Sequence, residues 1–366
     1  MKQEEILKRD WVKDLIHNQC AFALFRLPHA EEPSLIIQTK GKPLELNDYS
    51  ELNDKCGFVF APFVITEGNP LLLIQEDIRL SGWQAIGEWV NSSVLSSEAE
   101  QTYITPVRED EPGKSYDEAF DTFICALRNG QFDKLVLSRF KDLKSDIPSD
   151  VMHLFESASE QYPNAFVYLA YTPQAGLWMG STPEILLDGK SNNYATVALA
   201  GTMKASEKPV WSEKNKLEQD YVARYIREKL RSLGIIPHET GPVTAKAGGL
   251  IHLKTVFHFS FTNNARLGDV ITLLHPTPAV CGLPKEEAYR FICAHEGYDR
   301  TYYSGFLGPL NQEKDTHLYV NLRCMRITSS SIRLYAGGGL LTSSDSDSEW
   351  NETEDKMQTM LSLLIH

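Results

Sequence analysis

The chain has 366 residues, of which 42% are hydrophobic and 23% are charged, so its composition is that of a folded globular protein and excludes a largely disordered one. Its formal net charge of −13 disfavours binding to a nucleic-acid backbone or an anionic membrane through general positive charge. An anionic substrate would need a metal ion or a well-placed Arg or Lys.

The compartment can be inferred from the first residues and from the cysteines. The opening sequence MKQEEILKRDWVKDL mixes acidic and basic residues and lacks the apolar run of a signal peptide, and no segment has the length of a membrane span. The six cysteines are scattered without a CxxC pair, which argues against a zinc site or a disulfide framework. We therefore expect a cytoplasmic protein without a membrane or nucleic-acid partner.

Apolar runs in the first third of the chain predict β-strands. They cover residues 57–65, with an interruption at Pro62, and residues 71–80. The polar segment over 106–115, PVREDEPGKS, then predicts a connector.

Helix and strand patterns are clearer after this connector. Ser115 and Glu118 form a capping box that predicts a helix, and KLVLSRF at 134–140 predicts a strand. Further helices are expected over 212–233 and from about residue 349 onwards. Other strand-like segments are AFVYLAY (165–171), GLWMGS (176–181), TVFHFSF (255–261), HLYVNLRCMRI (317–327) and IRLYAGGGL (332–340). Because helices and strands do not alternate regularly, we expect an α+β fold with large, partly antiparallel sheets.

Two carboxylates stand where charge is costly. Glu218 lies on the apolar side of a predicted helix, in line with Val222 and Ile226, and must be paired, protonated or bound to a metal. A structural ion pair and a functional role both stay open for it. Glu184 opens an apolar strand, where burial would raise its pKa and let it act as an acid, and a strand-end charge facing solvent is the alternative.

Other charged positions also allow two interpretations. Lys134 at a strand edge would ordinarily be exposed, whereas in a cleft it could act as a base. Arg323 lies within an apolar strand pattern and needs an anion, such as a substrate carboxylate. Glu349, Glu352 and Lys356 share one face of the last helix, and this spacing favours a solvated face with an ordinary ion pair.

A series of short motifs follows the connector in a characteristic order. The motifs are KLVLSR, GSTPE, ALAGT, LIHLKT, HPTPAVCG, YDRTYYSG, NLRC, AGGGL and EWNETEDK. Over about residues 116–360 this series closely resembles the chorismate-utilising enzymes, and among them the isochorismate synthases. The resemblance implies a single large α+β domain of two face-packed, largely antiparallel sheets with helices outside. Residues 1–110 would form a divergent N-terminal part of this fold, and residues 111–366 the chorismate-binding catalytic region.

The resemblance also implies a reaction. Chorismate is a dianion with a 4-hydroxyl group, and isochorismate synthases add water at ring carbon 2 while the hydroxyl group at carbon 4 leaves. Because water is a poor nucleophile and hydroxide a poor leaving group, the reaction needs a base and an acid. Lys134 matches the base of the family and Glu184 its general acid. Lys134 would have to be partly neutral and Glu184 protonated, so we expect an enclosed site.

Further roles follow by resemblance alone. Glu218 and Glu352 match the two carboxylates that hold Mg²⁺, which would also bind the ring carboxylate of the substrate and offset its charge. Arg323 matches an arginine that binds a substrate carboxylate, and Glu349 matches a carboxylate near the metal. Other positions that match pocket residues of the family are Gly201, His252, Ala279, Gly337, Gly339 and Lys356.

Differences from sister enzymes narrow the expected activity. Anthranilate synthases carry Gln at the position of Lys134 and Thr at that of Ala279, and aminodeoxychorismate synthases carry a nucleophilic Lys at that of Ala200. The chain lacks these amination signatures, so we expect no glutamine amidotransferase subunit. A salicylate synthase, which also eliminates pyruvate, and a non-catalytic chorismate-binding protein are the alternatives. Isochorismate feeds menaquinone or siderophore pathways, and the sequence favours neither.

Overall fold

The computed structural model describes residues 11–92, 115–144, 151–190, 192–204, 209–247, 250–261, 266–311 and 313–364. These residues form two nine-stranded sheets in which every strand pair is antiparallel. Except for Ser115, the connector expected over 106–115 lies outside the described residues, as does the domain boundary near residue 110.

The strands of each sheet come from distant parts of the chain. In order across the first sheet they are β14 (Gly282–Leu283), β7 (Lys134–Lys144), β18 (Ser331–Leu340), β17 (Cys324–Ile327), β9 (Gly176–Thr182), β8 (Phe166–Thr172), β1 (Ala21–Arg26), β2 (Ser34–Gln38) and β6 (Ile78–Ser81). In order across the second they are β12 (His238–Ala247), β13 (Leu250–Ser260), β11 (Asn193–Lys204), β10 (Ile185–Lys190), β16 (Asp315–Val320), β15 (Phe306–Asn311), β4 (Cys56–Ala61), β5 (Leu71–Ile74) and β3 (Leu44–Leu46).

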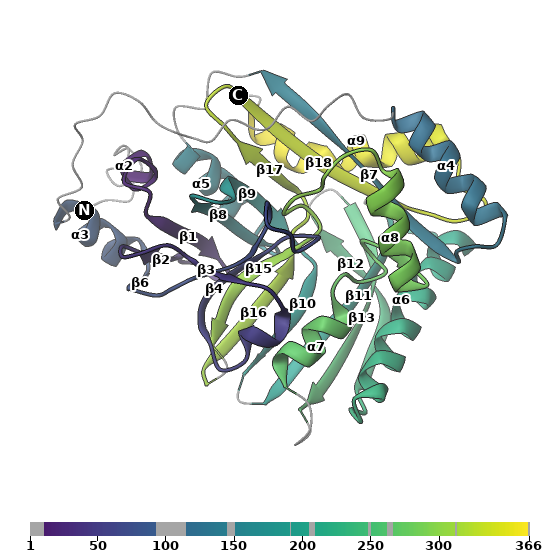
Figure 1. Cartoon of the computed structure of the whole chain (residues 1–366), viewed down its shortest axis with the longest axis horizontal. Helices are drawn as coiled ribbons and strands as arrows, with labels where there is room; N and C mark the ends of the chain where they lie inside the picture. Colours follow the sequence, from purple (N-terminus) through teal and green to yellow (C-terminus); the bar gives the residue numbers. More distant parts are fainter. Residues whose placement is uncertain are drawn as a thin grey trace.

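Helices cover the outer faces of the two sheets (Figure 1). On the first sheet they are α2 (Trp11–His17), α3 (Trp83–Ser92), α5 (Val151–Gln161) and α9 (Ser346–Leu364), with α4 (Tyr116–Arg128) and α8 (Lys285–His295) beside β7. On the second sheet they are η1 (Tyr49–Leu52), α6 (Glu213–Ser232) and α7 (Leu267–Leu274). The expected fold of two face-packed antiparallel sheets with outer helices is therefore confirmed.

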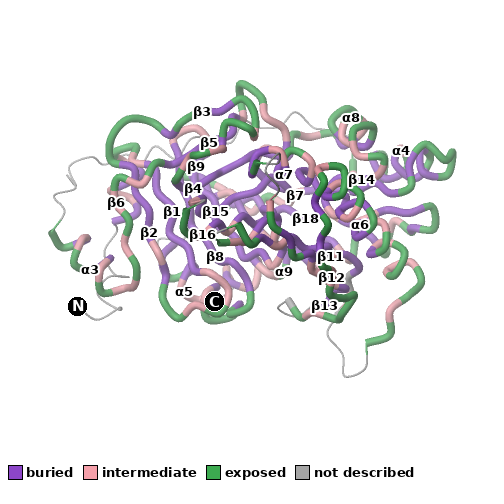
Figure 2. Tube along the Cα trace, turned by 90° about the horizontal axis from the view of Figure 1, so that it is seen from below, coloured by how far each residue is buried: buried purple, intermediate pink, exposed green. Residues whose placement is uncertain are grey.

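Side-chain alternation along β1 shows how the layers are held together. Phe22 and Leu24 pack in the core between the first sheet and its helices, whereas Ala23 and Phe25 pack in the core between the two sheets. All six residues of the strand are buried, because both faces are covered. Figure 2 shows that the central strands are buried along most of their length, and that exposed residues lie mostly in the peripheral loops and on the outer sides of the helices.

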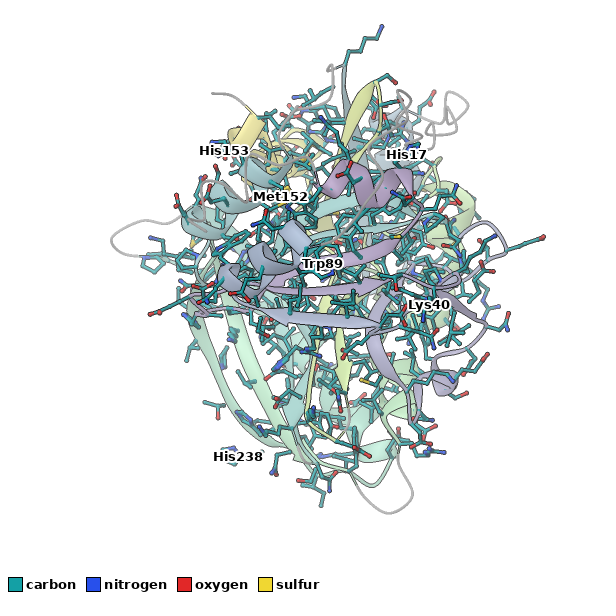
Figure 3. The ribbon with its side chains drawn as sticks, turned by 90° about the vertical axis from the view of Figure 1, so that its left-hand side faces the viewer. His17, Lys40, Trp89, Met152, His153 and His238 are labelled. Carbon is teal, nitrogen blue, oxygen red and sulfur yellow. The ribbon has the colours of Figure 1, made fainter. Side chains whose placement is uncertain are left out.

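The N-terminal strands contribute to both sheets. In the first sheet β1 pairs with β8, and in the second β4 pairs with β15, so the N-terminal segment extends sheets that also contain the motif-bearing strands. Figure 3 shows α3 and α5 over the N-terminal side of the molecule, where Trp89 and Met152 pack against the core beneath. None of the helices in the described parts of the chain is long and apolar enough to cross a membrane.

Local patterns predict some elements well and others poorly. The capping box of Ser115 and Glu118 is present and begins α4, and Ser212 caps α6. By contrast, the apolar run over 71–80 is not one strand, because it divides into β5 and β6, which belong to different sheets. The run over 317–327 divides in the same way into β16 and β17. Apolar composition alone cannot show where a chain passes from one sheet to the other, since both sheets are buried.

The placement of Arg323 within a strand is therefore wrong. Arg323 lies between β16 and β17, where the chain crosses between the sheets, and its backbone has φ +47°. This left-handed conformation interrupts the strand. Its carbonyl oxygen accepts a hydrogen bond from the N–H of Ser181 at 3.0 Å, which fixes the crossing against β9.

Candidate active site

Most of the predicted site residues line a single pocket at the β7–β18 end of the first sheet. Those that line it directly are Glu184, Gly201, Glu218, His252, Ala279, Arg323, Gly337, Gly339 and Lys356. Lys134 and Glu352 adjoin it through ion pairs with two of these residues. The structure thus brings together residues that are up to 222 positions apart, from Lys134 to Lys356.

Lys134 begins β7 and is completely buried, so the alternative of an exposed lysine at a strand edge is excluded. β7 lies between β14 and β18, and Leu135 and Leu137 pack toward α4 and α8. Alternation therefore directs Lys134 and Val136 to the opposite face, where Val136 lines the pocket. The Lys134 Nζ atom lies 2.8 Å from Oε1 of Glu218.

Glu184 stands immediately before β10 and is 4% exposed, so a solvent-facing charge at the strand end is excluded. Burial raises the pKa of its carboxyl group from an ordinary 4.5 to about 7, although the cations Lys134 and Arg323 oppose this rise. Its Oε1 atom has no hydrogen-bond partner among the described residues. A carboxyl group of this kind keeps a proton near neutral pH and can donate it inside the pocket.

The raised pKa has a consequence for stability. As the pH rises from 4.5 to about 7, Glu184 loses its proton in the unfolded chain but keeps it in the folded one, so burial of this group costs stability. Glu184→Gln cannot lose a proton and escapes this cost. The quantity to compare is the free energy of unfolding of the variant minus that of the wild type. We expect this difference to be larger above pH 7 than below pH 4.5, by on the order of 3 kcal/mol. Urea denaturation across this range measures the difference, and a difference that does not change with pH would contradict it.

Three carboxylates approach the glycines of β18. A methyl group on Gly339 would lie 2.2 Å from Oε1 of Glu218, and one on Gly338 would lie 3.1 Å from Oε2 of Glu349 and 3.9 Å from Oε1 of Glu352. Real side-chain atoms do not come this close, so any side chain at position 339 would displace the carboxylate of Glu218. The glycines allow α6 and α9 to bring their carboxylates against the strand.

Backbone and side-chain groups hold Glu218 in its charged form. Burial would raise the pKa of its carboxyl group, but Lys134, with help from Lys214 and Lys356, outweighs this effect and the pKa is lowered. The N–H of Gly201 also donates to Oε2 of Glu218 at 3.2 Å. Gly201 has φ +70°, at a bulge in β11 that turns this N–H toward α6.

The solvated face expected on the last helix is wrong, although its ion pair is present. Glu349 is 2% exposed and Lys356 is also buried, because α9 packs directly on β18 (Figure 1). The Nζ atom of Lys356 lies 2.6 Å from Oε1 of Glu352 and donates to the carbonyl oxygen of Gly337 at 2.8 Å. This face of α9 therefore forms part of the site.

The carboxylates fit the predicted magnesium site. Mg²⁺ binds oxygen ligands and commonly uses only one or two protein carboxylates together with water and substrate oxygens. Glu218 and Glu352 supply two such carboxylates, and the buried Oε2 atom of Glu349 has no partner among the described residues. No group of three or more His, Cys, Asp or Glu side chains in these parts of the chain could hold a metal ion by itself.

Neutral and cationic groups complete the pocket. Burial lowers the pKa of His252 to about 3, with Arg323 and Lys356 adding to the effect, so the imidazole is uncharged at neutral pH. Its Nδ1 atom lies 3.0 Å from the carbonyl oxygen of Gly201, which orients the ring. Arg323 and Lys356 can both attract an anionic substrate.

A buried ion pair behind the pocket joins two of its walls. Arg300 and Glu296 are each 1% exposed and contact each other through two hydrogen bonds of 2.6 Å. Arg300 also donates to the carbonyl oxygens of Val280 at 2.7 Å and Val136 at 2.9 Å, while Glu296 accepts hydrogen bonds from Ser138. The loop before β14 is thereby fixed to β7.

Reasoning from sequence missed Lys214, Tyr303 and Ser304. Tyr303 and Ser304 line the pocket and lie within the motif YDRTYYSG, but their residue types alone indicate no role there. Lys214 lies four residues before Glu218 on α6 and forms an ion pair with Glu349. The spacing of four, which places both side chains on one helix face, could have revealed it.

Comparison with known proteins gives the family. A family model described as "Chorismate binding enzyme" matches residues 51–365. The chain belongs to this family. It is 30% identical over 244 residues to the isochorismate synthase EntC of Escherichia coli K12, an alignment that covers 64% of this chain and 62% of EntC. The isochorismate synthase DhbC of Bacillus subtilis 168 is 27% identical over 319 residues, or 79% of this chain and 76% of DhbC.

A solved structure shows the same fold. MenF, the menaquinone-specific isochorismate synthase from Escherichia coli, superposes with a TM-score of 0.76 at 20% sequence identity. The superposition covers 98% of this chain and 92% of MenF, so the N-terminal strands are included in the likeness.

Proposed function

We propose that this chain is an isochorismate synthase, an isomerase that converts chorismate to isochorismate with the help of Mg²⁺. The observation that carries the proposal is that Glu184 and Glu218 line one pocket and that Lys134 adjoins it through its ion pair with Glu218. The names of the relatives EntC, DhbC and MenF support the same activity. The product would enter menaquinone or siderophore biosynthesis.

In this proposal each ionisable group of the pocket has one role in the reaction. Neutral Lys134 accepts a proton from the water that attacks ring carbon 2, and Glu184 donates a proton to the hydroxyl group that leaves carbon 4. Arg323 binds a substrate carboxylate. Glu218 and Glu352 would hold Mg²⁺, which supplies positive charge to the ring carboxylate. The Nζ atom of Lys134 lies 2.8 Å from Oε1 of Glu218, so the base of this proposal and one of its metal-binding carboxylates are neighbours.

Two further parts of the proposal concern the setting of the enzyme. Because water is the nucleophile, no glutamine amidotransferase subunit is needed to supply ammonia. All six cysteines are free thiols, which supports a reducing compartment and thus a cytoplasmic location.

The test is incubation of the protein with chorismate and Mg²⁺, followed by chromatographic separation of the products. Isochorismate alone is the expected result. Salicylate with pyruvate would instead indicate a salicylate synthase, and tight binding of chorismate without turnover would indicate a binding protein. Either of these results would overturn the proposal.

A further inference from the structure

Each carboxylate beside β18 is paired with its own lysine. Lys134 contacts Glu218, Lys356 contacts Glu352, and Lys214 contacts Glu349. The three negative charges are thus balanced by three positive charges within the protein. A divalent cation that approaches these carboxylates must therefore compete with ammonium groups that already occupy their oxygens.

Lys214 differs from the other two lysines. Lys134 and Lys356 adjoin or line the pocket and have roles in the proposed reaction, whereas Lys214 does not line it. The Lys214 side chain is 27% exposed, but its Nζ atom reaches Oε1 of Glu349, which is almost completely buried. Lys214 and Glu218 leave α6 one turn apart, and the ammonium group of Lys214 pairs with a carboxylate of α9.

We propose that Lys214 is a built-in counter-cation that weakens binding of a divalent metal ion to the protein without substrate, and so makes metal binding depend on the substrate. The inference rests on the proposed function for the location of the metal. With three carboxylates and three ammonium groups, the cluster has no net charge, so a dication alone adds two uncompensated charges. A dianionic substrate supplies the two negative charges that are missing. Metal and substrate should consequently strengthen each other's binding, to an equal degree.

The direct test measures metal affinity without substrate. Lys214→Gln removes the positive charge but keeps a side chain that can donate a hydrogen bond to Glu349. We expect isothermal titration calorimetry of the full chain with MgCl₂ to give a dissociation constant for the variant at least about tenfold below that of the wild type, because the dication no longer meets this ammonium group. Equal or weaker binding by the variant, or no measurable binding by either protein, would overturn the proposal.

Two further variants of this helix serve as controls. Lys216→Gln removes an exposed lysine of α6 that pairs with the exposed Glu213, so it should bind Mg²⁺ like the wild type. Lys214→Arg keeps the charge and should also resemble the wild type. If Lys214→Gln does not fold, as judged by circular dichroism, Lys214→Met replaces it in the same titration. Tighter binding by Lys216→Gln as well would show a general charge effect and contradict a specific role of Lys214.

A second titration tests the dependence on substrate. It uses Glu184→Gln to suppress turnover, with and without Lys214→Gln, and compares Mg²⁺ affinity in the absence and presence of chorismate. We expect chorismate to tighten Mg²⁺ binding by a larger factor when Lys214 is present. Equal factors would contradict the coupling. Because the first titration needs no turnover, failure of the isochorismate assay and failure of this inference are separate results.

Discussion

Replacement of Lys134 by glutamine is expected to lower the rate of isochorismate formation by about 10²- to 10⁴-fold, the range for loss of a general base. Lys134 lies on the pocket face of β7, and glutamine has a similar reach but cannot accept a proton from water. The measurement is kcat with saturating chorismate and Mg²⁺, with isochorismate separated by chromatography. Turnover close to that of the wild type would refute the assignment of Lys134 as the base.

The same substitution leaves Glu218 without its cation, so folding must be measured separately. Loss of one partner from a buried ion pair can cost about 3–5 kcal/mol. Thermal unfolding with Mg²⁺ present and calorimetric binding of chorismate show whether the pocket survives. Lys141→Gln is the matched control, because Lys141 lies on the same strand but is 38% exposed and pairs with Glu354. That variant should retain wild-type turnover.

Glu184→Gln is expected to reduce kcat by a similar factor of about 10²- to 10⁴-fold, with a much smaller change in KM. The amide has the shape of the carboxyl group and can donate a hydrogen bond, but it cannot transfer a proton to the leaving hydroxyl group. Steady-state kinetics with chorismate measures both constants. A variant that keeps its kcat, or one whose loss appears only in KM, would argue against Glu184 as the acid.

Stability measurements make this second result easier to interpret. Burial raises the pKa of Glu184 to about 7, so the stability of Glu184→Gln relative to the wild type should increase as the pH rises from 4.5 to 7. A variant that is less active but more stable cannot have lost activity through unfolding. Buried acids of this kind illustrate how an active site gives up stability for reactivity.

Local patterns were sufficient for elements whose determinants lie close together in sequence. The capping box of Ser115 and Glu118 fixes the start of α4 through contacts three residues apart. The position of Glu218 on the apolar side of α6 correctly indicated a carboxylate that needs a partner, and left an ion pair and a functional role open. The structure shows the ion pair, in which Oε1 of Glu218 contacts Lys134.

Contacts between distant segments could not be predicted in this way. Lys134 looks like an exposed strand edge because its neighbours β14 and β18 come from residues about 150 to 200 positions later. The face of α9 that bears Glu349 has the composition of a solvated surface, yet it packs on glycines of β18 that leave room for it. The crossing at Arg323 depends on two sheets whose strands are equally apolar.

The buried pair of Arg300 and Glu296 bears on how a pocket of this kind could use ammonia in place of water as the nucleophile. Its hydrogen bonds to the pocket walls end on main-chain atoms of Val280 and Val136 and on Ser138, and none involves the side chain of residue 134 or 279. These are two of the positions at which water-using and ammonia-using enzymes differ. In the proposed function these two positions select water over ammonia, and the frame that Arg300 and Glu296 form does not depend on their side chains.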